Sequence, residues 1–210
     1  MCASDAGGAV LWTVRKIAAT LSGMIDIEQH LCRPFRLLAR NALLANRRLD
    51  LACSALGPGE WEAPRTAFFP SLKETMVHLL NADRYYIDEF RGDRPTVRTP
   101  VGNRETAREF ARERAEVDEW LVDFSESLTD HDLARDVLIH WPDKVLTETL
   151  ADTLLHVFMH GQHHRGQIHA MLSGSSVAPP QIDEFILKGD DGPRAKDLAA
   201  LGWTEAQRRR

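Results

Sequence analysis

Five of the nine histidines in this 210-residue chain lie in one short stretch, where an average distribution would place roughly 0.6. They are His156, His160, His163, His164 and His169. Side chains four residues apart lie on one face of a helix, so His160 and His164 can direct both imidazoles at one metal ion. Neutral imidazole is a common ligand of zinc, nickel, copper and iron. The stretch therefore favours a metal site.

The spacing alone leaves the ligand set open. His156 and His160 also stand four residues apart, and His160 and His163 stand three apart. A tight site needs at least a third protein donor, and a catalytic one keeps a position open for water or substrate. His78 is a donor of the right type at the flank of an apolar helical stripe. The alternative is that His78 is a half-buried histidine hydrogen-bonded to a neighbour.

Several other polar residues are candidates for supporting roles. Glu74 lies one turn before the histidine of its helix and could act as a base or hydrogen-bond acceptor, or be an ordinary surface glutamate. Gln167 could hydrogen-bond a ligand or simply face solvent. His156 and His163 could hydrogen-bond the ligands without binding the ion. His169 is expected on the opposite side of the helix.

Long helices must position these histidines, and the apolar spacing predicts four of them. They span residues 27–56 (with a stable start at about Pro34), 71–90, 104–127 and 150–173. Asn103 is the expected cap of the third helix, and Thr149 with Asp152 of the fourth. We predict an all-α fold, an antiparallel four-helix bundle with mostly short connections and at most a short β-hairpin near residues 136–147.

Composition excludes several classes of protein. The net charge of −5 argues against a nucleic-acid binder. Arg108, Arg112 and Arg114 alternate with glutamates, which predicts a solvated helix face. Three widely spaced cysteines give neither a disulfide framework nor a metal clip, so a reducing cytoplasm is expected. The apolar runs are shorter than the ~20 residues of a membrane span, and the charges near the start do not fit a signal peptide.

Three parts of the sequence resemble one known family. They are Phe35–Asn41 with Asn46–Leu49, Phe68–Thr75 with His78–Arg84, and Leu155–His169 with Ala178–Asp183. Together they resemble the DinB-like family, a group of proteins regarded as metalloenzymes. The resemblance covers residues 30–187. We expect this segment to form the bundle domain, preceded by an extension (1–29) and followed by a tail (188–210).

The resemblance implies a four-helix bundle that binds a metal through three histidines, one on the second helix and two on the last. These fall on His78, His160 and His164. It also implies that homodimers are common and that some relatives use low-molecular-weight thiols. It fixes no reaction. Zinc is the first choice of metal, with nickel, iron or manganese as alternatives.

Two functional hypotheses follow. A divalent ion on three neutral histidines keeps its charge and open positions, which suits a thiol-using transferase or a hydrolase acting on a small-molecule substrate. The alternative is a non-catalytic protein in which the ion joins two helices. A fourth protein ligand would favour the second hypothesis.

The two ends lie outside the resemblance. The first 23 residues are either an overlong start or an additional helix. The final Arg208-Arg209-Arg210 run is expected to be a solvated tail.

Overall fold

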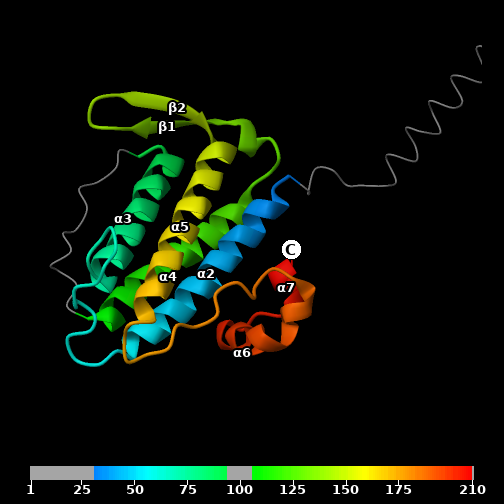
Figure 1. Ribbon diagram of the computed structural model, residues 1–210. Coiled ribbons are helices and arrows are strands. Elements are labelled where there is room, and N and C mark those ends of the chain that lie inside the picture. The colour runs from blue at the N-terminus through cyan, green and yellow to red at the C-terminus, as the bar shows by residue number, and fades with distance from the viewer. Residues whose placement is uncertain (1–30, 94–105, 210) are drawn as a thin grey trace, which may run out of the picture.

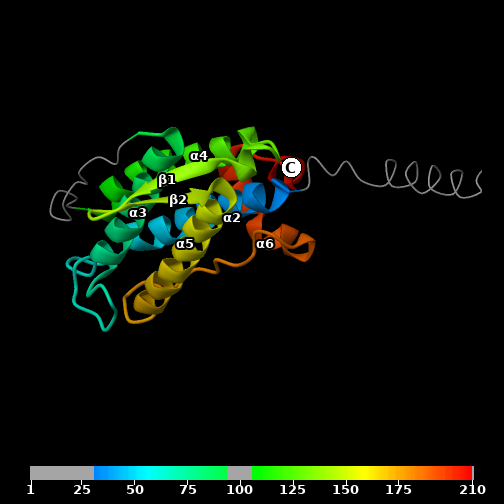
Figure 2. The same cartoon turned by 90° about the horizontal axis from the view of Figure 1, so that it is seen from above.

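The computed structural model describes residues 31–93 and 106–209, and four long helices form its main body (Figure 1). The helices are α2 (Arg33–Ser54), α3 (Leu72–Arg91), α4 (Ala107–Ser127) and α5 (Leu150–Leu172). An antiparallel hairpin, β1 (Asp136–His140) and β2 (Val145–Thr149), lies across the end of the bundle before α5 (Figures 1 and 2). The prediction of a helical bundle with a short hairpin is confirmed.

The helices do not simply alternate in direction. α2 runs antiparallel to α4, and α3 runs antiparallel to α5. In contrast, α3 and α4 run the same way, since Asp83 pairs with Arg114 and, further along both helices, Phe90 stacks on Phe124. The expectation of mostly short connections is wrong, because residues 55–71, 92–106 and 128–149 separate the four helices. The antiparallel pairing of α3 with α5 is the one that positions the histidines.

Helix ends follow local capping chemistry. The Thr106 side chain accepts from the backbone N–H of Glu109, whose carboxylate accepts in turn from the Thr106 N–H, so α4 starts there. Asn103, the predicted cap, lies outside the described residues, and the observed cap is the later threonine. Thr149 caps α5 as predicted, accepting from the Asp152 N–H at 3.1 Å.

The bundle core includes a buried ion-pair network. Arg114 is 1% exposed and donates to Asp83 and to Asp118, each at 2.6 Å. Arg108 and Arg112 are exposed as expected, but the prediction of a solvated position for Arg114 is wrong, because it lies on the face of α4 that meets α3. Among the described helices, none combines the length and the apolar character needed to cross a membrane.

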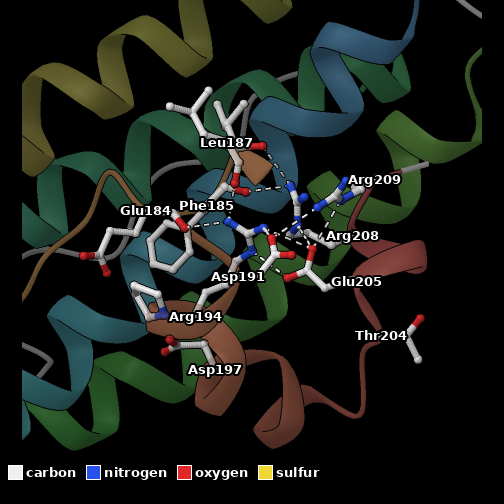
Figure 3. Close-up of polar contacts among 12 residues, drawn as sticks. Glu184, Phe185, Leu187, Asp191, Arg194, Asp197, Thr204, Glu205, Arg208 and Arg209 are labelled. Carbon is white, nitrogen blue, oxygen red and sulfur yellow. Dashed lines mark hydrogen bonds and ion pairs between the residues drawn. The ribbon is translucent and has the colours of Figure 1, made fainter. Parts of the chain in front are cut away.

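The end of the chain is folded. The expected solvated tail is wrong for Arg208, which is buried, while Arg209 is partly exposed and Arg210 lies outside the described residues. This end forms η4 (Lys188–Asp190), α6 (Asp191–Leu201) and α7 (Glu205–Arg209) beside α2 (Figures 1 and 2). Arg194 and Arg208, at 0% and 1% exposure, both donate to Glu205 (Figure 3). We call these three residues the arginine clamp. Arg40 on α2 donates to the Arg208 carbonyl at 3.3 Å, which ties α7 to the bundle.

Candidate metal centre

Three histidine rings from two helices converge at one place in the bundle. His78 lies on α3, and His160 and His164 lie one turn apart on α5. The Nε2 atom of His160 is 3.3 Å from Nε2 of His78 and 3.1 Å from Nε2 of His164. One potential ligand atom from each residue lies within 4.8 Å of the others. The structure thus brings together the three histidines selected from the sequence, which we call the histidine cluster.

The position of His78 follows from how α3 begins. Ser71 caps the helix by accepting from the Glu74 N–H at 3.1 Å. Val77 and Leu79 are buried on either side of His78, while His78 itself is half-buried. A flank position of this kind lets a side chain reach the seam between two helices without leaving solvent entirely.

Gln167 determines which nitrogen of His164 carries the proton. The Gln167 Oε1 atom lies 2.8 Å from His164 Nδ1, and an amide oxygen can only accept. His164 Nδ1 is therefore the donor, and in the neutral ring Nε2 presents a lone pair to the cluster. The other end of the amide, Nε2, lies 3.0 Å from Nε2 of His163 and donates to it. Gln167 and His163 therefore support His164 from outside the cluster.

The environment keeps the three rings uncharged. Burial, followed by the imidazoles of His164 and His78, lowers the pKa of His160 to about 4. Burial and then His164 lower the pKa of His78. Burial also lowers the pKa of His164, although its bond to Gln167 opposes the shift. At neutral pH all three rings are in the form that binds metals.

The nitrogen separations fit a metal site better than a hydrogen-bonded cluster. Around a tetrahedral ion with ligands at about 2.0–2.1 Å, two nitrogens lie about 3.3 Å apart. The two separations that involve His160 Nε2 are 3.1 and 3.3 Å, and the three ligand atoms all lie within 4.8 Å of one another. His164 Nε2 has no proton to donate, and the single in-plane site of His160 Nε2 cannot make good hydrogen bonds to both neighbouring rings. At least one of the two nitrogen–nitrogen contacts therefore has no proton between its atoms, and a cation bound there would remove the repulsion between the two lone pairs.

Comparison with known families agrees with this geometry. The family model described as "DinB family" matches residues 29–192. The chain belongs to the DinB family. The match contains all four bundle helices and the histidine cluster, and it stops near the start of α6. A search of curated proteins found no match.

An aromatic side chain covers one side of the DinB-family histidine cluster. The Phe69 ring stacks on His78 with centroids 4.4 Å apart and planes at 29°, and its centroid lies 5.9 Å from that of His164. The sequence prediction used Phe69 only as part of the family resemblance and missed this contact. The available signal was the aromatic pair Phe68-Phe69, which only Pro70 separates from the Ser71 cap of α3.

The remaining candidates lie around the cluster. The exposed His156 ring is 5.9 Å from that of His160, measured between centroids. Glu74 Oε2 accepts from the Ser71 hydroxyl at 3.1 Å, which is a contact of the helix start. His169 lies in the last turn of α5 and does not belong to the group of potential ligands.

A buried arginine fixes the adjacent face of α5, which meets α2. Arg165 is 4% exposed and its Nη1 lies 3.5 Å from Oδ1 of Asn46 on α2. A Cβ atom at Gly161 would lie 2.9 Å from Nη1 of Arg165, so a side chain there would push the guanidinium away. Gly161 and Arg165 thus hold α5 in the orientation that directs His160 and His164 toward α3.

Proposed function

We propose that this DinB-family protein binds one divalent metal ion through His78, His160 and His164 and is a metal-dependent enzyme. The main support for this proposal is the convergence of three neutral imidazole rings, in which Nε2 of His160 lies 3.3 Å from Nε2 of His78 and 3.1 Å from Nε2 of His164. Zinc is the first choice, and nickel, iron or manganese would also suit imidazole ligands.

The number of ligands supports an enzyme over a structural metal site. Within the described residues, the group around these histidines contains no fourth histidine, cysteine, aspartate or glutamate. Catalytic zinc sites commonly have three protein ligands and one open position, whereas structural sites are closed by four. The alternative is a non-catalytic site that joins α3 to α5, and the origin of the ligands on both helices supports that reading.

The reaction class we propose is thiol-using transfer or hydrolysis on a small-molecule substrate. When bound, the ion would supply a Lewis acid that favours deprotonation of a thiol or water. Gln167 holds His164 in the tautomer that directs Nε2 inward. Phe69 keeps water away from one side of His78. Together these two residues fix the orientation of the His164 ring and limit the access of water to the His78 ring.

Metal titration followed by an activity screen tests this proposal. Metal-free protein should take up one zinc ion per chain in competition with a chromophoric chelator. The loaded protein should then react with one of a panel of thiols and electrophiles, or hydrolyse one of a panel of esters and amides. Failure to bind zinc, nickel, iron or manganese would overturn the site. Tight binding with a large thermal stabilisation and no turnover would favour the structural alternative.

We also propose that the protein is a homodimer, as the family resemblance implies. Sedimentation equilibrium at micromolar concentration should give twice the 23.7 kDa chain mass. A single species of the chain mass would contradict this.

A further inference from the structure

A separate cleft lies next to the histidine cluster, between the hairpin and helices α3 and α5. Its volume is about 240 Å³, below the usual range for drug-sized ligands, so it suits a molecule built on one ring. Its apolar walls are Tyr86 from α3 and Ile139, Trp141 and Leu146 from the hairpin. Two of these walls are aromatic, which favours a flat group.

A series of ring contacts connects this cleft to the histidine cluster. The centroids of Tyr86 and His156 are 5.3 Å apart, and those of His156 and His160 are 5.9 Å apart with planes at 23°. His156 is itself a wall of the cleft. One helical turn, a rise of about 6 Å, separates His156 from His160. A molecule seated in the cleft can therefore extend one end to the cluster.

Glu148 gives the cleft its charge. The hairpin register pairs Ile139 with Leu146 and Val137 with Glu148, so Glu148 shares the face on which Val137 and Ile139 are buried. The Glu148 side chain itself is exposed to solvent. Within the described part of the chain, no hydrogen bond or ion pair is made by the Glu148 carboxylate. It is therefore free to bind a ligand.

The other charged groups around the cleft are few. The Asp152 carboxylate lies on the wall and accepts from the Thr149 hydroxyl at 2.7 Å. None of the described residues that form the wall is a lysine or arginine. Lys144 lies nearby, with its Nζ 4.6 Å from the centroid of the Trp141 ring. The wall itself is acidic and aromatic, which is complementary to an organic cation.

We propose that this cleft binds the substrate as a small organic cation, with a flat apolar body between Tyr86 and Trp141 and an ammonium or amidinium group at Glu148. The inference rests on the proposed function, because the other end of the molecule is the part presented at His160. An anion would meet two carboxylates, and a purely apolar molecule would gain no ionic contact with Glu148. Both are disfavoured relative to a cation of the same shape.

Three probes of nearly equal size test the charge preference. They are 2-phenylethylamine, 2-phenylethanol and phenylacetate, titrated into the full chain, with and without zinc, and followed by NMR. The amine should bind about tenfold more tightly than the alcohol, which corresponds to one favourable ionic contact, and phenylacetate most weakly. The tryptophan indole resonance that shifts with the amine should be the one lost in Trp141→Phe.

Matched variants locate the contact. Glu148→Gln should lower amine affinity about tenfold, leave the alcohol unchanged, and leave zinc affinity unchanged. Asp136→Asn is the control, because Asp136 is an exposed carboxylate on the same hairpin but does not form part of the cleft wall. It should change none of the three affinities.

The outcomes separate this inference from the proposed function. Equal binding of amine and phenylacetate, or equal losses in Glu148→Gln and Asp136→Asn, would reject the cation site while zinc binding could still stand. Charge-selective amine binding by a chain that takes up no metal would reject the proposed function and leave the cleft as a binding site only.

Discussion

The histidine cluster is partly buried and the two arginines of the arginine clamp are fully buried, and the two groups differ in how their nitrogens are satisfied. In the clamp, Arg194 donates to Glu205, Asp191 and the carbonyls of Glu184 and Leu187 (Figure 3). In the cluster, the Nε2 atoms face one another. A group completed by its own chain holds structure together, whereas a group completed only by something external is a binding site.

The family match divides the two regions in the same way. The histidine cluster lies inside the match to residues 29–192, and the clamp helices α6 and α7 lie almost entirely beyond it. The clamp therefore lies outside the part of the chain that the family model describes. Changes in the clamp should affect stability, and changes in the cluster should affect ligand binding.

Loss of a histidine ligand should have the largest effect. His160→Ala removes the ring whose Nε2 lies nearest both partners, and zinc affinity should fall about a thousandfold or more. His169→Ala is the matched control on the same helix and should leave affinity unchanged. Competition titration with a chelator measures both variants. Equal zinc affinities in the two variants would contradict the assignment of His160 as a ligand and His169 as a non-ligand.

Breaking the clamp should loosen the end of the chain without touching the metal. Arg194→Met leaves the Glu205 carboxylate without its closest partner, while Arg208 still pairs with it, and should cost about 1.5–3 kcal/mol of local stability. Hydrogen exchange should show early opening of residues 181–209, with α2 to α5 still protected. Zinc affinity should stay at the wild-type value. A parallel loss of zinc affinity would show that the two regions are energetically coupled.

Sequence alone predicted the histidine cluster better than the clamp, for a physical reason. His160 and His164 are four residues apart on one helix, so their meeting is local, and the family resemblance supplied His78. The clamp joins Arg194, Arg208 and Glu205 across a turn between two short helices. A terminal run of arginines such as Arg208-Arg209-Arg210 is most often solvated in proteins. Only the packing of α7 against α2 shows that Arg208 is buried.

The same limit explains Arg114 and the direction of the helices. Arg114 lies on the same face of α4 as the buried residues Phe110, Val117 and Leu121. The glutamates that alternate with the arginines made this part of the helix look fully solvated. Its partner Asp83 comes from another helix, so its burial depends on the direction in which α3 and α4 pack. Helix existence follows from periodicity, whereas packing direction depends on contacts that periodicity does not contain.

The two regions should lose stability in different pH windows. In the metal-free protein, burial and neighbouring rings lower the pKa of His160 from 6.5 to about 4, so the unfolded chain binds more protons between these values. Stability should fall as pH drops from about 6.5 to 4. The hydrogen bond from Arg194 lowers the pKa of Glu205 from 4.5 to about 2, which predicts a further loss below pH 4.5.

Substitutions assign each window to its region. His160→Gln should reduce the change between pH 6.5 and 4, to which His78 and His164 also contribute. Glu205→Gln should flatten the change below pH 4.5. Chemical denaturation at a series of pH values measures both. If Glu205→Gln altered only the upper window, the assignment of the acid-sensitive step to the clamp would be wrong.

Removing the support of His164 should have a smaller effect than removing a ligand. Gln167→Ala frees the ring to rotate and to change tautomer, and zinc affinity should fall about tenfold. Gln167→Glu keeps an acceptor at the same place and should restore most of the affinity. Failure of glutamate to improve on alanine would indicate that Gln167 acts through its contact with His163 instead.

Glu74 should show the smallest effect, and it distinguishes a catalytic base from a capping residue. Its Oε2 accepts from the Ser71 hydroxyl at 3.1 Å, and Glu74 belongs to the first turn of α3, where a negative charge is stabilising. Glu74→Gln should therefore cost about 0.3–1 kcal/mol of stability and leave zinc affinity within twofold. Ser71→Ala removes the same cap and should destabilise α3 without altering turnover. Once a reaction is found, a hundredfold loss of turnover in Glu74→Gln, with normal turnover in Ser71→Ala, would place Glu74 in the chemistry and overturn the capping role.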